Sequence, residues 1–301
     1  MGLLERDVPQ WDSDPQAKPR DLSGPGLASR LAKILTAAAL VEERAGHHVQ
    51  AGDLLEATWS LTRSFSGQND QLSQLIAVAL GRFQAGALRK MSEPPVQWLD
   101  RMSAVEPWRG MLDAIEANHR PRVTDDAGPD ETRKAYDRAW SAVIDALRQL
   151  SPCEVSKLSY EEIWKPAQDE LDRWQEAKGD HGPKSIFAVA LPNRTAAIRK
   201  AGRLPVDREL TAKILEIRQE KATSREGRWP EKFSDLDSRV CPGSSYEYQT
   251  RGAAMVIRFK GPIDDGGGGP LVLPLSFEVR APRPTPTSTR AQPTITPRPR
   301  A

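Results

Sequence analysis

Three helical faces lie close together between Ser29 and Met91, and they constrain the fold more than any other feature of the sequence. Apolar side chains recur there at the 3.6-residue spacing that places them on one side of a helix. The first face consists of Leu31, Ile34, Leu35, Ala38, Val41 and Ala45. The second consists of Ala51, Leu54, Leu55, Thr58, Leu61 and Phe65, and the third of Leu72, Leu75, Ile76, Ala79, Leu80, Phe83 and Ala87. Because only a few residues join them, we expect antiparallel helices whose core forms where the three faces meet.

The first two of these helices resemble a tetratricopeptide hairpin, because a glycine, Gly46, and a short turn separate them. No 34-residue period continues beyond this unit, so a regular repeat array is not expected. The sequence therefore predicts a mainly α fold of irregular antiparallel helical hairpins with a tetratricopeptide-like start.

Helical patterns continue as far as Ser224, but prolines interrupt them. Ser159 and Glu162 form a capping-box pattern, which predicts the start of a helix. Pro166 is expected to kink that helix, and Pro192 leaves residues 185–200 ambiguous between a helix and a break. Residues 207–224 return to a clear helical stripe.

The pattern changes after Trp229-Pro230. Residues 246–249 alternate, Arg251-Gly252 is suited to a turn, and residues 254–259 read as a returning strand. Residues 271–280 give a possible third strand. We therefore expect a small α+β module with a three-stranded antiparallel sheet.

The order of motifs in this module resembles that of a known family. A helix runs into Gly227-Arg228-Trp229-Pro230-Glu231-Lys232-Phe233-Ser234-Asp235-Leu236, and Cys241-Pro242-Gly243 and Tyr246-Glu247-Tyr248 follow. This arrangement is similar to the C-terminal module of a group of uncharacterised bacterial helical-hairpin proteins, whose ends resemble the globular domain of type II secretion major pseudopilins. The stretch Asp70-Gln71-Leu72-Ser73-Gln74-Leu75-Ile76-Ala77-Val78-Ala79 also resembles the helical part of that group.

The resemblance carries expectations about anchoring and metal binding. Pseudopilins have an N-terminal apolar helix with a processing site, and members of the helical group often begin with a membrane anchor; neither pattern occurs in this sequence. The resemblance thus implies a soluble branch, or a chain whose start lies downstream of the natural one. Pseudopilin-like loops bind calcium through acidic residues, and Asp264 and Asp265 occupy the matching region as weak calcium candidates.

These patterns divide the chain into four segments. We expect a disordered N-terminus over residues 1–26, a helical domain over 27–203, a helix plus small antiparallel sheet over 204–280, and a disordered Pro/Thr/Arg tail over 281–301.

Charge and cysteine content bear on partners and compartment. The formal net charge is +2, but five arginines and no acids lie from Arg280 onward, which leaves a net charge of −3 before the tail. No specific nucleic-acid partner is predicted, and no apolar run reaches the length of a membrane span. Cys153 and Cys241 are either two free thiols or one long-range disulfide, which requires an oxidising compartment. Without a visible signal or anchor we expect a cytoplasmic protein, or a periplasmic or membrane-anchored one if the true start lies upstream.

No catalytic constellation is visible, and no cofactor or metal is predicted. His47 and His48 are adjacent in a turn, which is more typical of solvated side chains than of a site. His181, beside Asp180, is the best candidate for a hydrolase of unknown substrate. Trp59 and Trp98 lie off or at the edge of their helical stripes, and we expect them to line a groove for a protein partner.

These observations favour a non-enzymatic protein-interaction or scaffold protein. An accessory component of a bacterial envelope or secretion system is the first alternative, and a hydrolase using a His/carboxylate site is the second.

Overall fold

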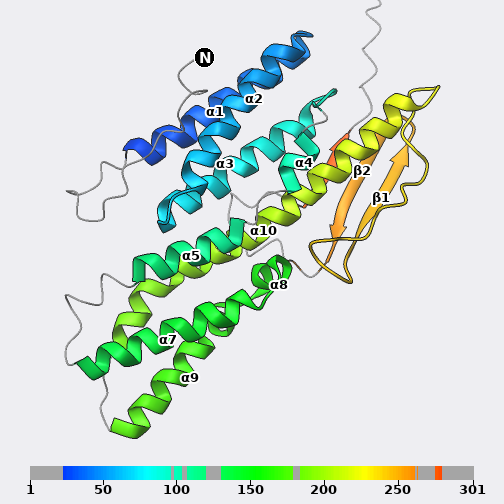
Figure 1. The fold of residues 1–301 in the computed structure, drawn as a ribbon. Helices are drawn as coiled ribbons and strands as arrows, with labels where there is room; N and C mark the ends of the chain where they lie inside the picture. The colour runs from blue at the N-terminus through cyan, green and yellow to red at the C-terminus, as the bar shows by residue number, and fades with distance from the viewer. Residues whose placement is uncertain are drawn as a thin grey trace, which may run out of the picture.

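The computed structural model describes residues 23–95, 98–103, 107–119, 130–178, 184–261, 263 and 275–279. The chain is mostly helical, with a small three-stranded antiparallel sheet near its C-terminal end (Figure 1). This confirms the predicted fold class. We expected residues 1–26 and 281–301 to be disordered. Residues 1–22 and 281–301 lie outside the described residues, whereas residues 23–26 are helical.

The order of elements is simple. The helices are α1 (Ser23–Arg44), α2 (His48–Ser66), α3 (Gln71–Lys90), α4 (Trp98–Ser103), α5 (Pro107–His119), α7 (Asp130–Arg148), α8 (Pro152–Lys157), α9 (Tyr160–Lys178) and α10 (Lys184–Thr223). The strands are β1 (Ser245–Arg251), β2 (Ala254–Lys260) and β3 (Ser276–Val279).

Helices α1, α2 and α3 contact one another, as the short connections predicted. The predicted face of α2 is largely buried, with Leu55, Leu61 and Phe65 in the core. The predicted face of α1 is wrong. This helix buries Ala28, Ala32 and Ala39 and leaves Leu31, Ile34 and Val41 exposed, because small side chains allow α1 to approach α2 and α3 closely.

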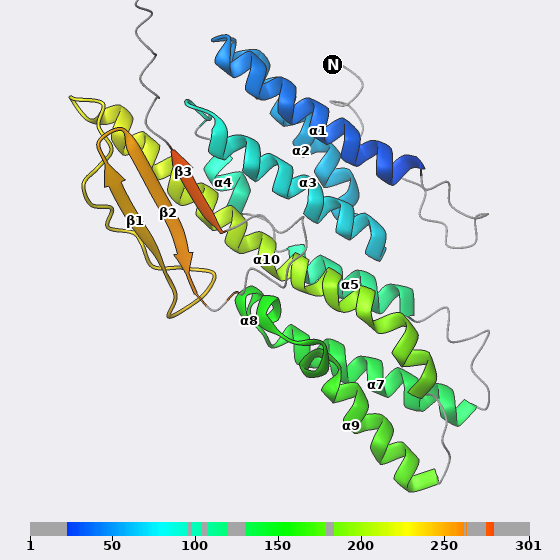
Figure 2. The same cartoon turned by 180° about the vertical axis from the view of Figure 1, so that it is seen from behind.

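Helix α10 is the central element of the molecule. It runs without interruption over 40 residues. Residues 185–200, which the sequence left ambiguous between a helix and a break, are therefore helical, and the expected domain boundary at residues 203–204 falls inside one helix. An interior proline costs a helix about 3 kcal/mol, but α10 contacts α3, α4, α5, α8 and α9, and this packing outweighs the loss (Figures 1 and 2).

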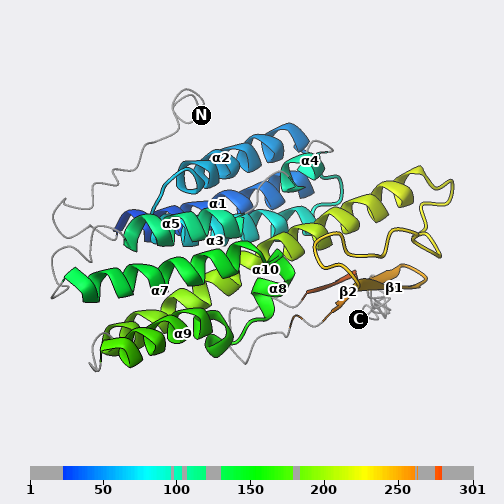
Figure 3. The same cartoon turned by 60° about the horizontal axis from the view of Figure 1, so that its bottom comes forward.

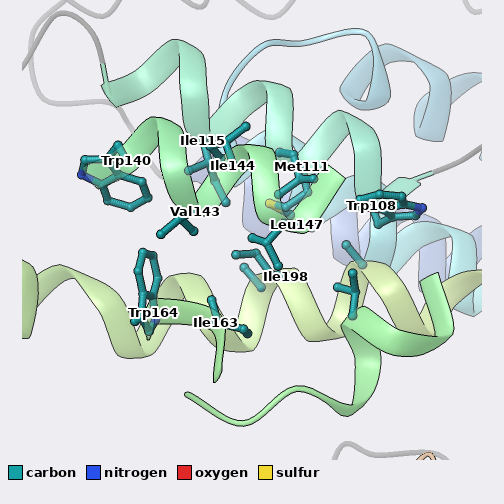
Figure 4. Packing of buried hydrophobic residues seen from close by; sticks show 14 of the residues in the cluster. Trp108, Met111, Ile115, Trp140, Val143, Ile144, Leu147, Ile163, Trp164 and Ile198 are labelled. Carbon is teal, nitrogen blue, oxygen red and sulfur yellow. The ribbon is translucent and has the colours of Figure 1, made fainter. Parts of the chain in front are cut away.

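The largest buried cluster joins α5, α7, α9 and the N-terminal half of α10 (Figure 4). Trp140 and Trp164 meet edge to face at one end of this cluster, with ring centroids 5.1 Å apart (Figure 4), and Trp164 Nε1 donates to Thr195 Oγ1 at 2.7 Å. The predicted capping box at the start of α9 is present, since Ser159 N donates to Glu162 Oε2 and Glu162 N to Ser159 Oγ.

The sheet is an antiparallel meander of order β1-β2-β3. Gly252, at φ 61°, supplies the left-handed position of the two-residue turn between β1 and β2. One face of the sheet packs on the C-terminal half of α10 (Figure 3), where Tyr246, Met255 and Ile257 meet Leu210 and Ile214. The predicted hairpin is confirmed, and β3 lies within the predicted third strand.

Candidate interaction surface

Helix α1 carries a stripe of large apolar side chains in contact with solvent. Leu27, Ile34 and Val41 are 64%, 65% and 61% exposed, and Leu31 is 37% exposed. We call these four residues the α1 stripe. They recur at helical spacing, so they form one continuous line along the helix rather than scattered apolar positions.

The orientation of α1 is fixed by polar contacts as well as by its alanines. Glu43 is buried, and its Oε1 accepts hydrogen bonds from the backbone N–H groups of Ser92, at 2.6 Å, and Glu93, at 3.3 Å. Rotating α1 to bury the stripe would expose its buried alanines, Ala28, Ala32 and Ala39, and would break both hydrogen bonds to Glu43. The exposed stripe is therefore a property of the packed structure and not of a loosely attached helix.

Basic side chains accompany the α1 stripe. Arg30, Lys33 and Arg44 are exposed, and Lys33 Nζ lies 5.2 Å from the ring centroid of Phe83. The acids of the helix are already engaged, because Glu43 is buried and Glu42 Oε2 lies 2.7 Å from His47 Nδ1. The open side of α1 is thus apolar with a positive border.

Helices α3 and α10 are joined by a buried ionic cluster that the sequence reading missed. Asp207 Oδ2 lies 3.2 Å from Arg82 Nε, and Asp207 Oδ1 lies 3.2 Å from Arg89 Nη2. Arg89 also donates from Nε to Thr211 Oγ1 at 2.8 Å. The only available signal was the seven-residue separation of Arg82 and Arg89, which places both on the same face of α3.

The C-terminal end of α3 is capped by a side chain from α10. Arg218 donates to the backbone carbonyls of Leu88, Arg89 and Met91, at the end of α3, where the last carbonyls lack N–H donors from a following helical turn. Burial lowers the pKa of Arg218 to about 10, while the nearby Glu43 acts in the opposite direction. Arg218 therefore couples α10 to the end of α3, beside the segment that anchors α1.

The loop between α10 and β1 is held by Glu209. This carboxylate accepts hydrogen bonds from Ser238 Oγ, at 2.5 Å, from Tyr246 Oη, at 3.0 Å, and from backbone N–H groups of Arg239 and Val240. Burial and the charge of Glu209 raise the pKa of the Tyr246 hydroxyl. One carboxylate of α10 thus accepts several hydrogen bonds from the loop and from β1, and Lys213 Nζ of the same helix donates to the Asp235 carbonyl at 2.6 Å.

A disulfide ties the same loop to the helical body. Cys153 at the start of α8 is bonded to Cys241, and their Cα atoms are 5.1 Å apart. The structure therefore has one long-range disulfide, which is one of the two alternatives that the sequence left open. Both cysteines are buried among residues of α10 and the sheet.

The predicted groove at Trp59 and Trp98 is not an open surface. The structure brings the two residues together, with ring centroids 5.9 Å apart and an edge-to-face arrangement, but Trp59 is 7% exposed and Trp98 is fully buried. They pack with Leu55, Leu88 and Met91, since the large rings fill the space where α2, α3 and α4 meet.

The remaining candidates do not form a site in the described structure. His47 and His48 are exposed, and His48 Nε2 lies 3.9 Å from Glu93 Oε2. Asp180, His181, Asp264 and Asp265 lie outside the described residues. Among the residues that the structure describes, no three His, Cys, Asp or Glu side chains are grouped in a way suited to a metal ion. None of the described helices combines the length and apolar character needed to cross a bilayer.

The exposed α1 stripe is thus the main candidate for an interaction surface in the described structure. Comparison with known proteins adds no identity, since no family model, no curated protein and no solved structure matches the chain.

Proposed function

We propose that the chain is a non-enzymatic interaction or scaffold protein that holds a protein partner on the α1 stripe. The observation that carries the proposal is the orientation of α1, which buries alanines and exposes Leu27, Ile34 and Val41. Exposed apolar side chains that line up into one patch mark interaction sites far more often than single exposed ones do.

The rest of the molecule supports a rigid scaffold. Glu43 ties the end of α1 to the segment after α3, and Arg218 ties the end of α3 to α10. The Cys153–Cys241 disulfide and the hydrogen bonds to Glu209 both hold the loop that leads into the sheet. A partner bound at α1 would meet a preorganised surface, which reduces the entropy lost on binding. The pseudopilin-like module, in this proposal, contributes a second surface. The sheet lies on the opposite side of the C-terminal half of α10 from α1 and α3 (Figure 2).

Site-specific photo-crosslinking tests the proposal. A photoreactive phenylalanine analogue replaces Ile34 in the full chain, expressed in its native cells. As the control, the same analogue replaces Lys165, an exposed residue of α9. We expect a discrete adduct with another protein from position 34 and none from position 165. Leu31→Asp should remove the adduct. Equal labelling from both positions, or no adduct from position 34, would contradict the proposal.

A second candidate function is an accessory component of a bacterial envelope or secretion system. The Cys153–Cys241 disulfide favours it, because such bonds persist in oxidising compartments and are rare in the cytosol. The test is maleimide labelling of protein trapped rapidly from its native cells. We expect no mass shift unless a reductant is added first; labelling of both thiols without reductant would reject this candidate.

A further inference from the structure

We propose that the partner on the α1 stripe is an amphipathic helix with acidic side chains beside its own apolar residues, paired lengthwise with α1. This inference rests on the proposed function and specifies its partner. It draws on the spacing of the stripe, its narrow width and the charges along its border.

The apolar residues of the open side follow a heptad pattern. Leu27, Leu31, Ile34, Ala38 and Val41 are separated by alternating steps of four and three residues. We call these five residues the seam. This alternation is the pattern of the a and d positions that pack against another helix. The large side chains of the set are exposed, so the seam has no partner within the described structure.

The seam is narrow, which favours a helix over a lipid surface. At 3.6 residues per turn its five positions fall within an arc of about 80°, whereas a helix that lies in a membrane interface buries a broad apolar face. The neighbouring arc of α1, with Ala28, Ala32 and Ala39, is already packed on α2 and α3. The side of α1 left for the partner therefore consists of the seam and its basic border.

The charges along the seam favour an acidic partner and oppose an antiparallel second copy of this chain. Arg30 and Arg44 fall on the same border of the seam, near its two ends, and both are exposed. An antiparallel second copy would set the border with Arg30 against the border with Arg44. Acidic residues on a partner helix would instead pair with both arginines.

The test uses two synthetic four-heptad peptides with leucine at the a and d positions. One carries glutamate at every e and g position, and the other carries lysine. Binding of each labelled peptide to the full chain is followed by fluorescence anisotropy. We expect the glutamate peptide to bind at least tenfold more tightly than the lysine peptide, and Arg30→Glu with Arg44→Glu to reverse this preference.

Two further variants test whether the peptide binds at the seam or at any exposed apolar side chain. Leu31→Asp with Ile34→Asp should abolish binding of the glutamate peptide. Val49→Asp should leave binding unchanged, because Val49 is 73% exposed but lies on α2 outside the seam.

Several outcomes would overturn the inference. They are equal binding of the two peptides, no binding of either, seam-dependent binding to anionic phospholipid vesicles without peptide binding, or a seam-dependent homodimer in sedimentation experiments. A crosslinked partner at position 34 together with any of these results would leave the proposed function standing and reject only the acidic helix. Loss of the crosslink as well would reject both.

Discussion

At the scale of single residues, the molecule depends on a few buried charges whose partners are far away in the sequence. Asp207 pairs with Arg82 and Arg89 across the α3–α10 interface, and Arg218 supplies the donors that the end of α3 lacks. Buried charges are expensive unless their partners are in place, so these contacts fix one arrangement of the two helices.

Asp207→Ala is expected to lower the free energy of unfolding by about 3–5 kcal/mol, because it leaves two arginines without their shared carboxylate. Urea denaturation measures the change. The matched control is Asp113→Ala, which breaks an exposed pair with Arg148 at 3.0 Å and should cost less than about 1 kcal/mol. Equal effects of the two substitutions would show that the buried cluster is not structural.

Glu216 gives a pH-dependent prediction. Burial, with a contribution from the charge of Asp235, raises the pKa of this carboxyl. The ionised side chain therefore opposes folding at pH 7, and this penalty disappears as pH falls through the raised pKa and below the unfolded value. Glu216→Gln should increase the free energy of unfolding at pH 7 by less than about 1 kcal/mol, since solvent screens a half-exposed group.

The increase in the free energy of unfolding caused by Glu216→Gln should shrink toward zero at pH 4. Urea denaturation at pH 7 and at pH 4 measures it. A gain that is the same at pH 4 and pH 7 would mean that the charge is not its cause.

At the scale of elements, the structure shows which local patterns decide a conformation. The β1–β2 hairpin follows from alternation and from Gly252, both of which are local, so the sequence was sufficient to predict it. The continuity of α10 through Pro192 was not predictable, because it depends on helices that pack around α10 from distant parts of the chain. The core face of α1 was not predictable either, because it also depends on packing against distant residues. Periodicity identifies an apolar face but does not show whether that face packs within the molecule.

Helix α10 also contains a position where close packing demands glycine. A Cβ on Gly202 would lie 2.8 Å from the carbonyl oxygen of Pro152 and 3.1 Å from Val155 Cγ1. Gly202→Ala should therefore lower the melting temperature and cost about 1–3 kcal/mol. The control is Gly86→Ala in α3, where nothing lies within 4 Å of the added carbon, and where alanine should stabilise by about 0.5–1 kcal/mol. A destabilising effect at both positions would point away from the α8 contact.

At the scale of the whole molecule, α10 and the disulfide join the helical body to the sheet. The candidate site could be predicted only in part. The apolar face predicted from the sequence contained Leu31, Ile34 and Val41 of the α1 stripe but not Leu27, and it did not show that these side chains are exposed. The sequence also contains the two cysteines, but it left open whether they are bonded. The groove predicted at Trp59 and Trp98 is wrong, because Trp59 of α2 and Trp98 of α4 pack against each other and against α3 in the core.

Removal of the disulfide tests this connection. Cys153→Ala with Cys241→Ala should lower the free energy of unfolding by about 2–4 kcal/mol, since a cross-link across 88 residues restricts the unfolded chain. Thermal unfolding with and without reductant measures the change. The natural chain should respond to the reductant and the double variant should not, and a response of both would assign the effect to something other than this bond.

The disulfide also closes the chain between Cys153 and Cys241 into a covalent ring that contains all of α9 and α10. A protease that cuts once within this ring leaves a single covalently joined molecule, heavier by one water, whose two pieces separate only after reduction. The same cut outside the ring releases a fragment at once. A comparison of reduced and unreduced digests therefore maps each cleavage to one side of the ring or the other.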